Sequence, residues 1–234
     1  MKAILKKELK AYFTSPLGYA ILIILFFFGG FAYYTAFSNC SADMTYVFNY
    51  MITIVFFVIP VITMRSFSEE KRQKTDQLLL TAPVKNGSIV FGKFLSCLIF
   101  FNVFIALMIV YNLIFFFFGG QPDFMIFLGN IIGIELFAGS LIAIGIFISS
   151  LTESQVVSAV SSFAVSFFLL MLNNVSSTTN NTVIKSICDW VSFSDRYYSF
   201  TDGIFNIANF VFFFSVIAVF LFLTARVIDR KRWA

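Results

Sequence analysis

Six long apolar runs constrain this chain more than any other feature of its sequence. Each run has about the 17 to 25 residues that a helix needs to cross the hydrocarbon core of a bilayer. We predict six spans, at residues 19–37, 47–64, 94–118, 124–148, 156–172 and 207–227. The expected fold class is an all-α membrane protein in which residues 1–234 form one transmembrane domain. An even number of crossings places both termini on the same side.

The charges agree with this prediction and indicate an orientation. Hydrophobic residues make up 59% of the chain and charged residues only 12%, whereas soluble domains carry roughly a quarter charged residues. Fourteen of the 16 lysines and arginines lie before the first span, between the second and third, or at the C-terminal end of the chain from Arg226 onward; only Lys185 and Arg196 lie elsewhere. The positive-inside rule therefore predicts cytoplasmic termini. We expect the chain in a cell membrane, a bacterial-type inner or plasma membrane.

The chain contains no histidine. This excludes Ser-His-Asp and Cys-His nucleophile pairs, His-ligated zinc and His proton relays. Cys40, Cys97 and Cys188 are too scattered for a metal cluster, and whether Cys40 and Cys188 pair on the outer side is open. We expect no catalytic residue, cofactor or metal in this chain, and no nucleic-acid partner.

Two further segments are predicted to lie along the membrane surfaces. In residues 1–16, apolar side chains share one face beside a lysine face, which is typical of an interfacial helix with its apolar face in lipid. These apolar residues are Leu5, Leu9, Tyr12 and Phe13. The alternative is a basic leader that only determines topology. The extracellular segment 173–206 is predicted to form short outer helices that hold amphipathic aromatics at the interface. These aromatics are Trp190, Phe193, Tyr197, Tyr198 and Phe200.

The cytoplasmic loop between the second and third spans contains a predicted helix over residues 66–83. Ser66 and Glu69 have the spacing of a capping box, Glu69 and Glu70 stand in the favoured first turn, and Pro83 ends the helix. Its apolar residues are Leu78, Leu79 and Leu80. These leucines either bind a partner or pack against the protein's own spans or the membrane interface.

Residues 87–93 match GxxxxGK, the beginning of a P-loop. We reject a nucleotide site there because Phe94 replaces the Ser or Thr that holds magnesium, and a span follows without the strand-then-helix context. If ATP drives this protein, a partner subunit must bind the ATP and magnesium.

The loop resembles the cytoplasmic loop of ABC-2 type transporter permeases, particularly the small six-span subunits of the gliding-motility and multicopper-enzyme-maturation groups. That family's pattern runs EER, GT, a leucine cluster, PV, and GK entering the third span. The matching residues are Glu69, Glu70, Arg72, Thr75, Leu78, Leu79, Leu80, Pro83, Val84, Gly92 and Lys93. Lys74 departs from the pattern, since the family usually has glycine there. Looser matches at 145–152 with Gln155, 200–204 and 230–233 extend the resemblance over nearly the whole chain.

The resemblance implies the permease subunit of an ABC exporter, which forms the translocation path while a separate ATPase subunit hydrolyses ATP. It implies that the loop is a coupling helix docking into that subunit. The implied coupling residues are Glu69, Glu70, Arg72, Thr75, Leu78, Leu79, Leu80 and Pro83. Further expected partners are a second permease, identical or different, the lipid bilayer, and an accessory extracellular protein. The spans do not identify the substrate.

Two features inside the spans are candidates for the translocation path or the dimer contact. Glu135 lies about 16 Å into the fourth span, near the midplane. It is either a functional group or a protonated side chain that hydrogen-bonds a neighbouring helix. Four serines recur along one face of the fifth span: Ser154, Ser158, Ser162 and Ser166. They either permit close helix packing or, as the resemblance implies, lie near the permease dimer contact and the path.

Other functions remain open at this stage. A proton-coupled secondary transporter would use Glu135, although its expected broken spans repeated in two halves are weak or absent. A noncatalytic membrane anchor would not need two long connecting segments. A membrane enzyme is disfavoured because the sequence has no HExxH motif, no paired intramembrane acids and no nucleophile with a base.

Overall fold

The computed structural model describes residues 2–38, 44–75, 86–117, 124–178, 185, 190–201, 203 and 206–233. Six helices in these ranges are long and apolar enough to cross a membrane. They are α2 (Pro16–Ser38), α3 (Met44–Thr63), α6 (Asn86–Phe117), α7 (Phe124–Leu151), α8 (Gln155–Thr178) and α11 (Ile207–Trp233). The shorter helices are α1 (Lys2–Thr14), α4 (Ser68–Arg72) and α10 (Phe193–Thr201). The predicted all-α membrane fold with six spans is confirmed.

The helix ends differ most from the predicted spans at α6, which begins at Asn86 rather than at Phe94. Hydropathy marks where a helix leaves the hydrocarbon, whereas backbone hydrogen bonding continues the helix into the polar region. Residues 87–93 are therefore helical throughout, and a phosphate-binding loop requires a non-helical backbone before its helix. This agrees with the exclusion of a P-loop.

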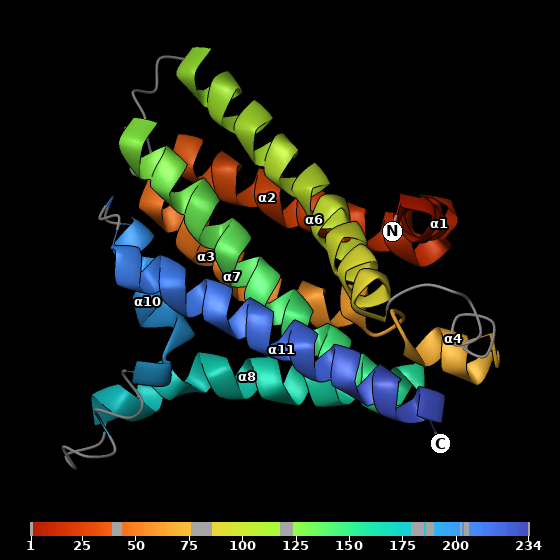
Figure 1. Ribbon diagram of the computed structural model, residues 1–234. Coiled ribbons are helices and arrows are strands. Elements are labelled where there is room, and N and C mark those ends of the chain that lie inside the picture. The colour runs from red at the N-terminus through yellow and green to blue at the C-terminus, as the bar shows by residue number, and fades with distance from the viewer. Residues whose placement is uncertain are drawn as a thin grey trace.

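The long helices run beside one another as a tilted bundle (Figure 1). The N-terminal helix α1, the short helix α4 and the C-terminal end of α11 lie at one end of the bundle, and α10 lies at the opposite end (Figure 1). Both ends of the chain are thus on the same side of the spans, as an even number of crossings requires.

Helix α7 is the central helix and contacts α3, α6, α8, α10 and α11. Its small residues allow these neighbours to come close. A Cβ atom at Gly145 would lie 2.2 Å from Thr63 Oγ1 on α3, and one at Gly133 would lie 2.9 Å from Phe200 Cβ on α10. The fold therefore needs glycine at these two contacts.

Three aromatic residues that we predicted at the outer interface lie in the core instead. Phe193, Tyr197 and Phe200 of α10 are at most 3% exposed, because α10 folds back onto α7. Trp190 and Tyr198 are exposed, as an interfacial position requires. The aromatic character of this segment thus serves internal packing as well as the surface.

Helix α1 packs on the protein and does not place its whole apolar face in lipid. Tyr12 is 4% exposed, donates a hydrogen bond to the Ile62 carbonyl oxygen at 2.9 Å, and stacks on Phe100 with ring centroids 5.0 Å apart. Burial raises the pKa of Tyr12 well above its ordinary value, so the phenol remains a neutral donor. Leu5 and Leu9 are half-buried. The predicted helix is present, but its apolar face is shared between α6 and the surroundings.

The serine stripe of α8 faces the protein's own helices. Ser158, Ser162 and Ser166 are at most 6% exposed, on a helix that packs against α3 and α7, whereas Ser154 is exposed. Small side chains let α8 approach its neighbours closely. This placement supports the packing alternative, and a role of the serines at a dimer contact or along the path stays a prediction.

Candidate coupling site

Helix α4 is much shorter than the helix predicted over residues 66–83, because it ends in a Schellman motif. The Thr75 N–H bonds to the Glu70 carbonyl at 2.9 Å and the Lys74 N–H to the Lys71 carbonyl at 3.0 Å, while Lys74 has a left-handed φ of 56°. This helix end was not predicted, because lysine rather than the usual glycine occupies the left-handed position. A single continuous helix over 66–83 is therefore wrong.

The predicted capping box does not form at the start of α4. Phe67 precedes the helix without any side-chain cap. Instead, Ser149 Oγ at the end of α7 accepts the Phe67 N–H at 3.0 Å and the Ser68 N–H at 3.1 Å. The Glu69 carboxylate pairs with Arg65 at 2.8 Å. A neighbouring helix thus supplies the cap that we had assigned to Ser66.

Replacing Lys74 with glycine should stabilise the protein by about 0.5–1 kcal/mol. A left-handed conformation costs a residue with a Cβ atom roughly 1–2 kcal/mol, and the greater freedom of glycine in the unfolded chain offsets part of that gain. Unfolding of the purified protein in detergent by denaturant measures the change. Lys74→Ala is the matched control, since it removes the charge but keeps the Cβ atom. Equal stabilisation by both variants, or none by Lys74→Gly, would contradict this account.

A buried lysine connects three helices at this end of the bundle. Lys93 on α6 is 0% exposed, and its Nζ lies 2.8 Å from the carboxylates of both Glu8 on α1 and Glu70 on α4. The other carboxylate oxygen of Glu70 lies 2.9 Å from Lys7 Nζ. We call Lys93, Glu8, Glu70 and Lys7 the Lys93 cluster.

The surroundings of Lys93 compensate for the loss of water around its ammonium group. Beyond the two carboxylates, its Nζ donates to the Ser66 carbonyl oxygen at 2.5 Å and lies 4.8 Å from the centre of the Phe67 ring. A buried charge is tolerated only when it is paired and hydrogen-bonded in this way. The Lys93 cluster therefore fixes the relative positions of α1, α4 and α6.

Further contacts attach α4 to the rest of the bundle. Lys71 Nζ donates to the Ser150 carbonyl oxygen at the C-terminal end of α7, where the helix dipole favours a cation. Arg65, just before α4, donates to Ser15 Oγ at 2.6 Å, at the junction of α1 and α2. A cleft of about 470 Å³ lies between α1, α4 and the start of α6. A displacement of α4 would therefore act on several spans together.

The structure describes four of the eight predicted coupling residues. Glu69 and Glu70 are engaged by basic residues of this chain, and the Thr75 hydroxyl donates to the Glu70 carbonyl at 3.3 Å. Arg72 is exposed. The other four predicted coupling residues lie outside the described residues: Leu78, Leu79, Leu80 and Pro83. The two cysteines whose pairing was left open, Cys40 and Cys188, also lie outside them.

Glu8 and Lys7 were missed by the sequence reasoning. Glu8 is the single acidic residue of the lysine-rich N-terminal helix. An isolated acid among lysines was the one sequence feature that could have pointed to an ion pair there. Lys93 had been considered only within the GK match and the rejected P-loop. Pairing it with Glu8 joins residues 85 positions apart, and such a contact follows from tertiary packing rather than from local sequence.

Glu135 lies at a contact between α6 and α7. Its Oε1 accepts a hydrogen bond from Asn102 Nδ2 at 2.9 Å, and Asn102 also donates to the Leu98 carbonyl at 3.1 Å. Hydrogen bonds of this kind hold helices together in membranes. The geometry supports the alternative that Glu135 bonds a neighbouring helix.

Replacing Glu135 with glutamine should change the free energy of unfolding by less than about 1 kcal/mol, because the amide oxygen still accepts the Asn102 hydrogen bond. Glu135→Leu should cost about 1–2 kcal/mol, because it removes the acceptor. Denaturant unfolding in detergent compares both variants with the parent protein. A large loss in Glu135→Gln would show that the carboxylate has a role beyond this bond.

The comparisons with known proteins agree with this architecture. The model of a family described as "ABC-2 family transporter protein" matches residues 2–233, nearly the entire chain. No curated protein matches the chain. Together with the six spans, the match shows a multi-pass membrane permease whose family implies an ABC ATPase as partner. The chain belongs to the ABC-2 family of transporter proteins.

Proposed function

We propose that this chain is the permease subunit of an ABC exporter and that α4, with the segment that follows it, receives movement from a separate ATPase subunit. The observation that carries the proposal is the anchoring of α4. Its carboxylates and Lys71 are engaged by α1, α6 and α7, while Arg72, Gln73 and Lys74 are exposed. Helix α4 is thus attached to the bundle, and its C-terminal end is available to a partner.

The proposed mechanism is a shift between two populations of the spans. ATP binding and hydrolysis change the surface that the ATPase offers to α4, and only a difference in affinity between two permease states moves their equilibrium. Because the Lys93 cluster holds α1, α4 and α6 together, we expect these elements to move as one unit. Inward-open and outward-open arrangements would then alternate.

The partners in this proposal follow from charge and family membership. Arg72 and Lys74 are exposed bases, which suit an acidic surface on the ATPase. ATP and magnesium belong to that subunit. A second permease, identical or different, completes the path, and an accessory extracellular protein is a further candidate partner. The cytoplasmic side is assigned to the end that carries α1 and α4 by the distribution of basic residues.

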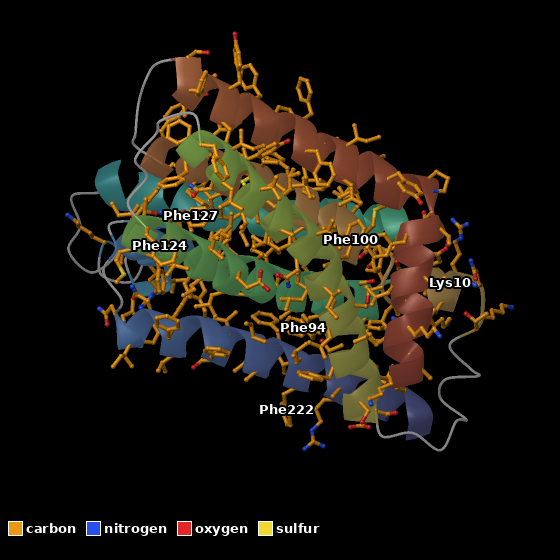
Figure 2. The ribbon with its side chains drawn as sticks, turned by 90° about the horizontal axis from the view of Figure 1, so that it is seen from above. Lys10, Phe94, Phe100, Phe124, Phe127 and Phe222 are labelled. Carbon is orange, nitrogen blue, oxygen red and sulfur yellow. The ribbon has the colours of Figure 1, made fainter. Side chains whose placement is uncertain are left out.

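Copurification from native membranes tests the coupling. We expect an ABC ATPase to copurify with the tagged chain. The yield of copurified ATPase should fall severalfold when serine replaces all three of Leu78, Leu79 and Leu80. Lys10→Ala is the control, because Lys10 is an exposed lysine of α1 (Figure 2) and lies outside the replaced segment. If no ATPase copurifies, the proposed coupling surface is wrong. It is also wrong if the serine variant elutes like the parent protein and still copurifies with the full amount of ATPase.

The proton-coupled alternative makes a different prediction for Glu135. If that acid carried protons, Glu135→Gln would abolish transport, and transport would depend on the proton gradient. Our proposal expects the variant to retain transport that requires the ATPase and is insensitive to the gradient. The hydrogen bond from Asn102 to Glu135 supports a structural role that needs no proton transfer.

A further inference from the structure

A second cleft lies at the same end of the bundle, between α7 and α11, away from the Lys93 cluster. Its volume is about 750 Å³. Its walls combine apolar and charged side chains: Phe147, Leu223, Val227, Arg226, Arg230 and Asp229. A surface of this kind suits a ligand that is itself part apolar and part charged.

The two arginines lie at the depth where the headgroups of a bilayer begin. The helical rise from Ile207, where α11 starts, to Arg226 is about 28 Å, close to the ~30 Å of a hydrocarbon core. Arg230 lies one turn further, about 6 Å beyond Arg226, on the same face of the helix. Phe222, one turn before Arg226, projects from the outer side of α11 (Figure 2) and is 58% exposed.

Neither arginine forms an ion pair within the described part of the chain. Arg226 and Arg230 are exposed, and the guanidinium of Arg226 lies 5.0 Å from the centre of the Phe222 ring. The acid of the cleft is engaged elsewhere, because Asp229 Oδ1 accepts a hydrogen bond from Asn86 Nδ2 at 2.5 Å. By contrast, Lys7, Arg65 and Lys93 are each neutralised by a carboxylate of this chain.

From these observations we propose that the α7–α11 cleft binds the headgroup of an anionic phospholipid. Guanidinium groups bind phosphate oxygens with two parallel hydrogen bonds, and basic pockets between membrane helices are suited to anionic headgroups. The apolar wall of Phe147, Leu223 and Val227 offers a surface for the upper part of the acyl chains. The hydrogen bond between Asp229 and Asn86 joins this cleft to the start of α6. A bound lipid would therefore stabilise the α6–α11 contact.

Native mass spectrometry of the purified full-length chain tests the site, with phosphatidylglycerol and phosphatidylcholine as probes. We expect phosphatidylglycerol to bind more tightly, and the Arg226→Gln/Arg230→Gln variant to bind it about tenfold more weakly. Lys2→Gln/Lys10→Gln is the matched control, since it removes two exposed charges from α1 at the same end of the bundle. An excess of inorganic phosphate should not displace the lipid, because phosphate lacks the apolar part.

Several outcomes would overturn the proposal. One is equal binding of the two lipids, and another is unchanged phosphatidylglycerol binding by the arginine variant. An equal loss in the Lys2 and Lys10 control would indicate diffuse attraction to surface charge instead of a site. Displacement by inorganic phosphate would indicate a plain anion site. The Arg226→Lys/Arg230→Lys variant is the control for misfolding, because it retains both positive charges. Its affinity for phosphatidylglycerol should lie between that of the parent protein and that of the glutamine variant.

Discussion

Replacing Lys93 with methionine should lower the free energy of unfolding by about 3–5 kcal/mol, a magnitude typical of removing one partner from a buried ion pair. The side chain of Lys93 is 0% exposed and that of Glu70 is 10% exposed. Methionine would leave the carboxylates of Glu8 and Glu70 close together without their shared cation. Unfolding in detergent by denaturant measures the loss. We also expect the variant to lose transport, because α4 would no longer be held to α1 and α6.

A charge-compensated variant separates this effect from a simple loss of packing. Adding Glu8→Gln and Glu70→Gln to Lys93→Met removes the unpaired carboxylates and should recover a large part of the lost stability. Lys2→Met is the surface control, and an exposed lysine should change stability by less than about 0.5 kcal/mol. If Lys93→Met is as stable as the parent, the Lys93 cluster does not hold these helices together.

Replacing Gly145 with alanine should destabilise the protein by about 1–3 kcal/mol, the usual cost of inserting an extra methyl group into a close contact. The added Cβ would lie 2.2 Å from Thr63 Oγ1 and 2.8 Å from Thr63 Cβ. Thr63 cannot turn away without loss, because its hydroxyl donates to the Ile59 carbonyl at 3.0 Å. Helices α3 and α7 must therefore separate where α3 leads into α4.

Gly87→Ala is the matched control for Gly145→Ala. Both residues lie within helices, but a Cβ at Gly87 would meet nothing within 4 Å. Alanine favours the helix by roughly 0.5–1 kcal/mol over glycine, so Gly87→Ala should be neutral or stabilising. If both variants lose stability equally, the close approach of α3 and α7 is not the cause.

The long apolar runs predicted the spans correctly because bilayer thickness imposes a minimum length that hydropathy records. The pattern at Ser66, Glu69 and Pro83 overstated the length of the cytoplasmic helix, since hydrophobic and capping signals do not reveal a left-handed lysine at position 74. Local patterns also leave open which side of an amphipathic helix meets protein and which meets lipid. For this reason Tyr12 was predicted to face lipid, although it packs against α6.

The candidate site was only partly accessible to sequence reasoning. Glu69 and Glu70 were found through the family pattern, but their partners Arg65, Lys7 and Lys93 depend on how α1, α4 and α6 pack. The serine stripe was recognised from its spacing, yet spacing does not tell which neighbour a helix face meets. Such assignments need the tertiary arrangement, in which α8 lies against α3 and α7.

Site-specific photocross-linking from position 72 tests the central claim most directly. A photoreactive residue in place of Arg72, which is exposed at the end of α4, should cross-link to an ABC ATPase in native membranes, with a yield that changes when ATP is added. The same probe in place of Phe27, which is 66% exposed on α2, should give no such product. A nucleotide-dependent cross-link from position 72 alone is the result that we predict. Absence of an ATPase product from position 72, or equal yields from both positions, would contradict the account.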